Sequence, residues 1–134
     1  SFGGKDYLVI YDSYSKWLEL DLLSEKTAAR LVDIFSDKFS HYGIIEECVC
    51  DNVPYNSRVF LGFAENFGFR VTNSSPRYPR SNGLAEKAVS IAKNLLRKNN
   101  DVNLGLLQYR NSPIMSLGFS PAQLFFGRRL RDRL

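Results

Sequence analysis

The sequence predicts a layered α/β domain, because strand-like and helix-like hydrophobic patterns follow one another along the chain. Two alternating segments, 6–12 and 17–23, come first, and segments of helical periodicity are then interleaved with short apolar runs. The chain has 134 residues, of which 44% are hydrophobic and 13% aromatic, which is enough for one packed core and too little for two. We therefore expect a single domain over residues 1–134 whose first strand is truncated, as in a piece cut from a longer protein.

The first half predicts a hairpin, a helix and a strand. Turn-forming residues separate 6–12 from 17–23, and the second segment alternates apolar and acidic residues as a half-exposed strand does. From 27 to 42 the apolar residues lie on one helical face, which Gly43 closes. The members of that face are Ala28, Leu31, Val32, Phe35, Phe39 and Tyr42. The run 44–50 then predicts a strand that ends at Asp51.

The second half predicts three further helices and one short strand. Ser57 caps a helix that Gly68 closes, with Phe60, Phe63, Ala64 and Phe67 on its apolar face, and 69–72 follows as a strand. Two prolines make 74–83 an extended loop. A long helix then runs from about 82 to 97 with Ala85, Ala88, Val89, Ala92 and Leu96 towards the core. A shorter helix ends near 109, and Ser120-Pro121 begins the last one.

The charge of the chain is distributed unevenly. Residues 1–66 hold six Lys and Arg against eleven Asp and Glu, a net charge of −5, whereas 67–134 hold twelve against three, a net charge of +9. A basic half favours a polyanionic partner, most simply DNA. A solvated basic surface explains the charge alone equally well.

The cysteine content argues against a structural metal or a disulfide. Cys48 and Cys50 share one face of a predicted strand, where neighbouring thiols rarely bridge, and the single histidine, His41, leaves no zinc-ligand set. Buried free thiols in a reducing compartment are expected. No apolar run approaches the roughly 18 residues of a membrane span, so no membrane partner is expected.

Two carboxylates raise the question of catalysis. Asp51 ends a predicted strand, and Glu86 stands one turn into the long helix, on a polar face that continues through Ser90, Lys93 and Arg97. If both carboxylates meet in a cleft, a divalent cation relieves their repulsion and supports phosphoryl transfer. Considered alone, however, a turn after a strand and a favourable interaction with the helix dipole explain the two residues better.

Four segments resemble the integrase catalytic core of gypsy-type LTR retrotransposons and, more distantly, of retroviruses. They are "GKDYLVIYDSYSKWLEL" (4–20), "DNVPYNSRVF" (51–60), "SSPRYPRSNGLAEKAV" (74–89) and "YRNSPIMSLGFSPAQLFFGRRLR" (109–131). The resemblance implies a ribonuclease-H-like three-layer fold with a central mixed sheet of about five strands between helices. It also implies a homodimer and a nuclear protein that acts on DNA.

The same resemblance assigns the acidic residues. The family holds two Mg²⁺ or Mn²⁺ ions with an Asp-Asp-Glu triad, in which Asp51 matches the second Asp and Glu86 the Glu. The first Asp of the family lies several residues before the match to Gly4, upstream of Ser1. Asp12 matches a turn residue of the family, and capping of that turn is its expected role.

The loop after Asp51 departs from the family pattern. Val53 stands where relatives have glycine, and the glutamine that follows the proline in relatives is missing. A β-branched residue fits poorly where a glycine allows positive φ or close approach of substrate. We expect a degenerate or host-adopted copy with impaired or lost catalysis. The alternatives are an active core completed by an upstream Asp and a non-catalytic scaffold for dimerisation or host partners.

DNA contacts are expected from the basic second half. Arg77 and Arg80 lie on the predicted loop, Asn82 at the helix start, and Lys93 and Arg97 in line with Glu86. Retroviral relatives have a DNA-contacting Lys four residues after the Glu, where this chain has Ser90. The C-terminal residues Arg128, Arg129, Arg131 and Arg133 fit a DNA contact and a solvated tail equally well.

Overall fold

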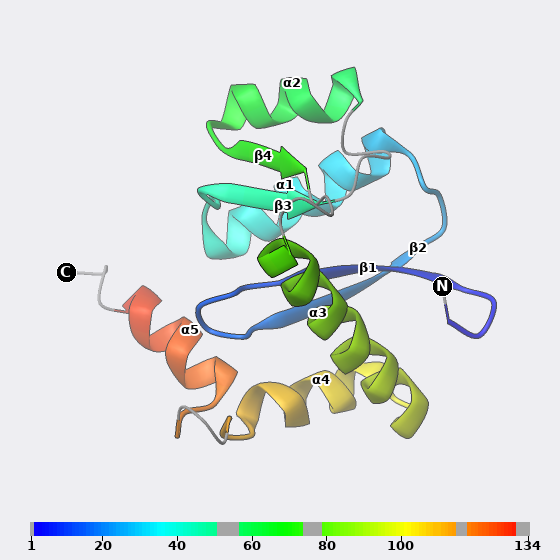
Figure 1. Cartoon of the computed structure of the whole chain (residues 1–134), viewed down its shortest axis with the longest axis vertical. Coiled ribbons are helices and arrows are strands. Elements are labelled where there is room, and N and C mark those ends of the chain that lie inside the picture. The colour runs from blue at the N-terminus through cyan, green and yellow to red at the C-terminus, as the bar shows by residue number, and fades with distance from the viewer. Residues whose placement is uncertain (1, 51–56, 74–78, 115–117, 131–134) are drawn as a thin grey trace. The chain divides into compact units, whose positions relative to one another are not determined.

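A computed structural model describes residues 2–50, 57–73, 79–114 and 118–130 (Figure 1). Its elements are β1 (Asp6–Tyr11), β2 (Leu18–Leu23), α1 (Ala28–Tyr42), β3 (Glu47–Cys50), α2 (Arg58–Phe67), β4 (Arg70–Asn73), α3 (Pro79–Lys98), α4 (Val102–Asn111) and α5 (Pro121–Leu130). The chain forms two compact units, one of residues 1–22 with 86–134 and one of residues 23–85. We call them the hairpin unit and the phenylalanine unit.

The four described strands pair in two two-stranded sheets. β1 and β2 form the expected hairpin, whereas β3 and β4 run parallel, with Glu47 opposite Arg70 and Cys50 opposite Asn73. The predicted order of strands and helices is therefore confirmed. The hairpin gives an antiparallel pair and β3–β4 a parallel one, which are the two kinds of strand pairing that a mixed sheet contains. The described residues form four strands in two separate sheets, whereas the resemblance implies a single sheet of about five strands.

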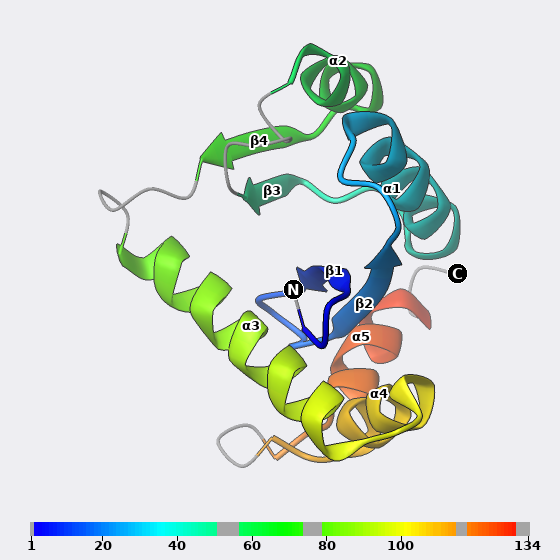
Figure 2. The same ribbon diagram turned by 90° about the vertical axis from the view of Figure 1, so that its right-hand side faces the viewer.

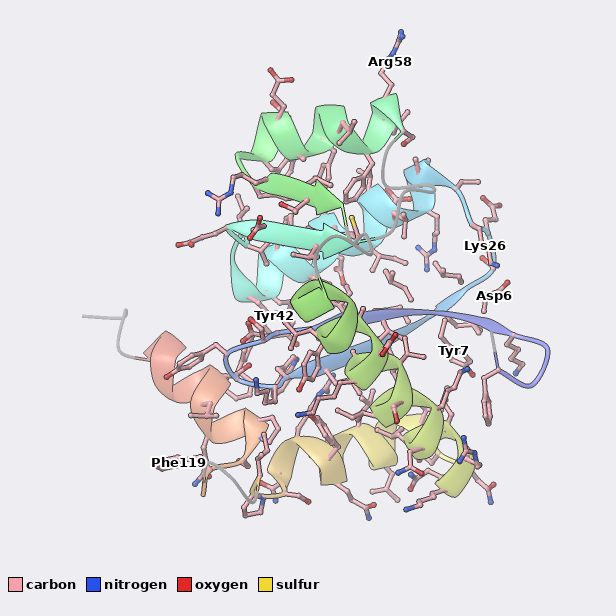
Figure 3. All side chains as sticks on the ribbon, viewed as in Figure 1. Asp6, Tyr7, Lys26, Tyr42, Arg58 and Phe119 are labelled. Atoms are coloured by element: carbon pink, nitrogen blue, oxygen red, sulfur yellow. The ribbon has the colours of Figure 1, made fainter. Side chains whose placement is uncertain are left out.

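The phenylalanine unit is held together by aromatic rings. Phe60 is fully buried, and its ring centroid lies 5.5 Å from that of Phe35 on α1 and 6.2 Å from that of Phe69. Phe39 stacks on Phe63 of α2 with ring centroids 5.9 Å apart. The two helices thus interlock through the faces that the sequence predicts, and Arg58 extends away from the start of α2 into solvent (Figure 3).

Caps fix the ends of these two helices as predicted. The Thr27 and Ser57 hydroxyls each accept a hydrogen bond from the backbone N–H three residues on, at 3.2 Å. Gly43 and Gly68 close α1 and α2 with φ of 86° and 83°, which only glycine adopts without strain.

Some predicted boundaries are wrong. β3 begins at Glu47 rather than at 44, and α3 begins at Pro79, so 79–83 is helical rather than part of a loop. Proline at the first helical position lacks only an N–H that would have no partner there, which explains the earlier start. Residues 74–78 lie outside the described ranges.

The core face of α3 agrees with the predicted one at Ala88 and Ala92 and differs from it elsewhere. Ala88, Ala92 and Leu95 are buried, whereas Ala85 and Val89 are exposed and Leu96 is only partly covered. Leu95 packs with Leu18 of β2 and Leu106 of α4, and Figure 2 shows α3 as one long helix that leads into α4. The helix carries two overlapping apolar stripes, and it buries the one that contains the large Leu95.

The hairpin turn confirms the expected role of Asp12. Its carboxylate accepts hydrogen bonds from the Ser15 N–H, at 3.1 Å, and from the Ser15 hydroxyl. The Ser15 oxygen in turn accepts the Trp17 N–H at 3.2 Å. Lys16 adopts a positive φ of 65°, a conformation that this bonded turn imposes on a non-glycine residue. Asp12 is therefore a turn-forming residue.

Glu19 corrects the expectation that 17–23 is a half-exposed strand. Its side chain is buried and forms an ion pair of 2.5 Å with Arg110 of α4. The Arg110 guanidinium also donates to the Leu18 carbonyl at 2.6 Å and lies 4.3 Å from the Trp17 ring centre. We call Trp17, Leu18, Glu19 and Arg110 the Arg110 brace. A buried carboxylate is tolerated here because its partner is bound to it directly.

The last two helices begin as predicted. The Asp101 carboxylate accepts the N–H groups of Asn103 and Leu104, at 3.0 and 3.2 Å, and so caps α4. At α5, Ser120 and Gln123 exchange side chain–backbone hydrogen bonds in a reciprocal capping box. In the described part of the chain, none of the helices combines the length and the apolar character needed to cross a bilayer.

Candidate functional site

The exposed face of α3 carries the part of the predicted site that the structure describes. Glu86, Ser90, Lys93 and Arg97 are all exposed, and they lie opposite the buried row that contains Ala92. At 100° per residue these four positions fall within about 60° of one another around the helix axis. The helix therefore presents one carboxylate and two cations in a single line to solvent.

The remaining predicted site residues are only partly placed. Asp51 and Arg77 lie outside the described residues, so the meeting of Asp51 with Glu86 stays a prediction. Arg80 and Asn82 belong to the first turns of α3, and their side chains are outside the described part. The structure thus brings together Glu86, Lys93 and Arg97, which share one helix.

Two further basic residues of α3 lie outside the predicted line and were not considered in the sequence analysis. Lys87 and Lys98 are exposed as well, about 100–120° around the helix from Glu86. They extend the positive charge of α3 beyond the line of Glu86. Listing every basic residue outside the apolar face of the helix, and not only those in line with Glu86, would have found them.

The predicted donors suit a divalent metal, and of the two the structure describes only Glu86. Carboxylate oxygens such as those of Glu86 are the ligands that Mg²⁺ and Mn²⁺ prefer, and an exposed carboxylate keeps its lone pairs available. Among the described residues, no three His, Cys, Asp or Glu side chains are grouped so that they could hold a metal ion. Asp51 and Glu86 are thus donors of the right type, and their grouping rests on residues outside the described ranges.

Cys48 and Cys50 of β3 are not joined in a disulfide, as predicted, but they are half-buried rather than buried. A hydrogen bond from Cys50 lowers the pKa of the Cys48 thiol, and partial burial and the charge of Glu47 oppose this effect. They stay half-buried because β3 alternates between two faces and neither is fully covered.

The sequence is related to one curated protein over nearly its whole length. It is 33% identical over 137 residues to the uncharacterized protein K02A2.6 of Caenorhabditis elegans, in an alignment that covers 95% of this chain. The chain spans 11% of the length of that relative. No protein-family model matches the sequence.

Solved structures with the same fold are viral integrase cores. The catalytic core domain of BIV integrase superposes with a TM-score of 0.77 at 18% identity, covering 97% of this chain and 96% of that one. The HTLV-2 integrase catalytic core in complex with magnesium, in its trimeric form, gives a TM-score of 0.68 at 17% identity over 90% of this chain and 93% of that one. A chain of the simian T-cell lymphotropic virus intasome, solved with PP2A regulatory subunit B56 gamma, gives 0.75 at 21% identity over 90% of this chain and 52% of that one.

Proposed function

Because this chain has the ribonuclease-H-like fold of the catalytic cores of retroviral-type integrases, we propose that it is a DNA-binding integrase core of the gypsy retrotransposon class. Its ancestral activity is metal-dependent polynucleotidyl transfer, and in this chain that activity is impaired or lost. The fold and the DNA-binding face are what the domain retains.

The line of polar residues on α3 is the observation that carries the proposal. Lys93 and Arg97 are exposed on the face that begins with Glu86, and the opposite face is anchored by Leu95 in the core of the hairpin unit. A helix fixed on one side holds its cations at a constant spacing along the other, as phosphate contacts require. Arg77, Arg80 and Asn82 extend the proposed contact towards the start of α3.

Asp51 and Glu86 are the residues that would hold Mg²⁺ or Mn²⁺. When bound, the metal supplies an activated water or 3′-hydroxyl and stabilises the leaving oxygen in phosphoryl transfer. Glu86 contributes an exposed carboxylate from α3, whereas Asp51, which lies outside the described ranges, stands two residues before Val53 in the sequence. The proposed impairment comes from the sequence after Asp51, in which a β-branched residue replaces the glycine of relatives and one residue is missing.

A second copy of the chain is the proposed protein partner. The HTLV-2 catalytic core is solved in a dimeric form as well as a trimeric one. We place the domain in the nucleus, where its DNA target lies, and a tagged parent chain that stayed outside the nucleus would contradict that placement. Homodimerisation is checked by light scattering over a concentration series.

The state of the metal site is tested by calorimetric titration. Mg²⁺ and Mn²⁺ are added to the wild-type chain and to a chain with both Asp51→Asn and Glu86→Gln. We expect no binding in either chain at millimolar metal. Metal binding by the wild-type chain that is lost in the double variant, together with strand transfer by the parent protein, would show instead that the enzyme is active.

DNA binding is tested with two variants of equal charge. Lys93→Ala with Arg97→Ala removes two cations in line with Glu86, and Lys87→Ala with Lys98→Ala removes two from the adjacent face. We expect the first pair to reduce the slope of log affinity against log salt by about 2 and the second pair to leave it nearly unchanged. Equal effects would mean that the face of Glu86 is not the DNA contact.

The scaffold alternative gives a different result in the same assays. A chain that dimerises but binds duplex DNA with an affinity independent of salt has lost the electrostatic contact, and its retained fold then serves protein association. The metal titration does not separate the DNA-binding core from the scaffold, whereas the salt series does.

A further inference from the structure

We propose that Ser112 is a phosphorylation site for a proline-directed serine kinase, and that its phosphate weakens the end of α4. Ser112 and Pro113 form an exposed Ser-Pro pair at the C-terminal cap of this helix, whereas the Ser-Pro pair at the start of α5 is buried. The proposal goes beyond the DNA-binding function and does not depend on it.

Pro113 gives Ser112 the backbone conformation that suits a kinase. A proline disfavours the helical region for the residue before it, so α4 ends at Asn111 and Ser112 is extended, with φ of −91° and ψ of 130°. Proline also has no backbone N–H, so an enzyme pocket that would leave such a group without a partner selects proline over other residues. The acceptor serine is thus extended and is followed by the residue that this class of kinase recognises.

The Ser112 hydroxyl is accessible and held only by local contacts. Ser112 and Pro113 are both exposed, and the hydroxyl donates a hydrogen bond of 2.6 Å to the Gln108 carbonyl oxygen. The Ser112 backbone N–H bonds to the Tyr109 carbonyl oxygen at 3.2 Å. A helix end of this kind opens locally at low cost, because water can replace the partners of both groups. The hydroxyl can therefore reach a kinase while the rest of the domain stays folded.

Ser120 shows the same dipeptide in a structural role. It is 2% exposed, and Pro121 beside it is fully buried. The Ser120 hydroxyl accepts the Gln123 N–H at 3.2 Å, and the Ser120 N–H donates to the Gln123 side chain at 2.9 Å. Ser120 is thus inaccessible while α5 is folded. A third pair, Ser75-Pro76, lies outside the described ranges. Ser112 and Ser120 therefore provide one motif at two opposite degrees of exposure within a single chain.

The transfer balances with ATP as the phosphoryl donor. The Ser112 Oγ forms a bond to the γ-phosphorus while the bond from that phosphorus to the bridging oxygen of ADP breaks, and the hydroxyl proton passes to a base of the kinase. The products are phosphoserine and ADP. The esterified Oγ no longer carries a proton, so it cannot donate to the Gln108 carbonyl oxygen.

The phosphate lies at the end of α4 that accepts negative charge least well. The last carbonyl groups of a helix carry partial negative charge, and a phosphate adds a charge of about −1.5 to −2 at neutral pH. The nearest cation along the chain is Arg110, which is bound to the buried Glu19 and to the Leu18 carbonyl oxygen. A phosphate that competes for Arg110 takes the partner of Glu19 away, and one that does not stays unneutralised. In both cases the end of α4 loses stability.

The first test maps phosphorylation on the folded chain. The chain is incubated with ATP and a purified proline-directed kinase that modifies a peptide of residues 106–118, and tandem mass spectrometry distinguishes the three Ser-Pro pairs. A peptide of residues 114–126 gives the intrinsic rate at Ser120. After correction for the two peptides, we expect Ser112 to be modified at least about 10-fold faster than Ser120, because a buried cap must open before it reacts. Similar corrected rates, or a folded chain without phosphate on Ser112, would overturn the proposal.

The second test measures the effect of the phosphate on stability. We expect the melting temperature of the phosphorylated chain to be lower by about 3–5 °C and to recover after phosphatase treatment. Ser112→Ala, incubated with the same kinase, is the control, since it reports any shift caused by a phosphate elsewhere. A chain phosphorylated at Ser112 that melts at the same or a higher temperature than the unmodified chain would contradict the weakening of α4.

Discussion

The two units of this molecule are stabilised by different kinds of contact. In the phenylalanine unit, rings from α1 and α2 and that of Phe69, just before β4, pack at centroid distances of 4.5–6.2 Å. The hairpin unit has a small leucine cluster and, beside it, the Arg110 brace, in which Arg110 contacts three consecutive residues that lie 91–93 positions before it in the sequence. Apolar burial is non-directional, whereas hydrogen bonds require particular atoms to meet.

This difference follows from how each unit is assembled along the chain. The phenylalanine unit is one continuous segment, so neighbouring elements need only bury their apolar faces. The hairpin unit joins the first 22 residues to the last 49, and its register must be set between distant segments. Arg110 sets it by donating twice to the Leu18 carbonyl, at 2.6 and 3.1 Å, and once to Glu19.

The largest loss of stability is expected from the phenylalanine unit. Phe60→Ala removes a fully buried ring that contacts rings on α1 and α2, and we expect the free energy of unfolding to fall by about 3–5 kcal/mol. Chemical denaturation measures the loss. Phe60→Leu is the control and should cost less than half as much, because it keeps most of the apolar volume. Equal losses would mean that the ring contacts, rather than the filled volume, hold this unit.

The corresponding change in the hairpin unit is Arg110→Ala. It leaves Glu19, whose side chain is 11% exposed, buried without its cation, and we expect a loss of about 3 kcal/mol. Adding Glu19→Gln should recover part of the loss, because a neutral amide is easier to bury. A double-mutant cycle by denaturation gives the coupling between the two residues. A coupling energy near zero would contradict the brace.

Local features of this fold could be predicted from the sequence. Ser57, Gly68, Asp12 and the phenylalanine face of α2 act as predicted, because a cap, a turn or an amphipathic face depends on residues within one or two turns. The core face of α3 could not be assigned in the same way. Two apolar stripes compete there, and packing with Leu106, a residue of another helix, decides between them.

The candidate site could be predicted only in part, for a related reason. The exposure of Glu86, Lys93 and Arg97 along one face depends on a single helix and agrees with the prediction, whereas their role in a site stays a prediction. The buried pair of Glu19 with Arg110 was not foreseen, because an acidic residue in an alternating strand indicates exposure unless its partner, 91 residues away, is known. Whether Asp51 meets Glu86 depends on long-range contacts in the same way and stays a prediction.

Two glycines in equivalent helical settings sharpen the comparison of the units. A Cβ on Gly105 of α4 would stand 2.8 Å from the Asn99 amide nitrogen and 2.9 Å from a Leu95 methyl, whereas one on Gly62 of α2 meets nothing within 4 Å. We expect Gly105→Ala to destabilise the protein by about 2 kcal/mol through overpacking. Gly62→Ala should stabilise it by about 0.5–1 kcal/mol through helix propensity. Thermal unfolding measures both, and effects of the same sign would contradict the close approach of α3 and α4.

The smallest expected effect is an alkaline loss of stability in the hairpin unit alone. Burial is the main reason that the pKa of the Tyr109 phenol is raised, and the neighbouring Tyr11 raises it further. The Tyr109 hydroxyl donates a hydrogen bond to the Lys16 carbonyl oxygen at 2.8 Å. Below about pH 10 the phenol is protonated in both the folded and the unfolded chain, so its contribution is fully present. Above pH 10 the unfolded phenol ionises first, so stability falls by about 1.4 kcal/mol for each pH unit until the folded phenol also ionises. Tyr109→Phe should lower the free energy of unfolding by about 1 kcal/mol at pH 8 and should remove this part of the alkaline slope. Denaturation at pH 8, 10 and 11 tests it, and a slope unchanged in the variant would place the alkaline sensitivity elsewhere in the protein.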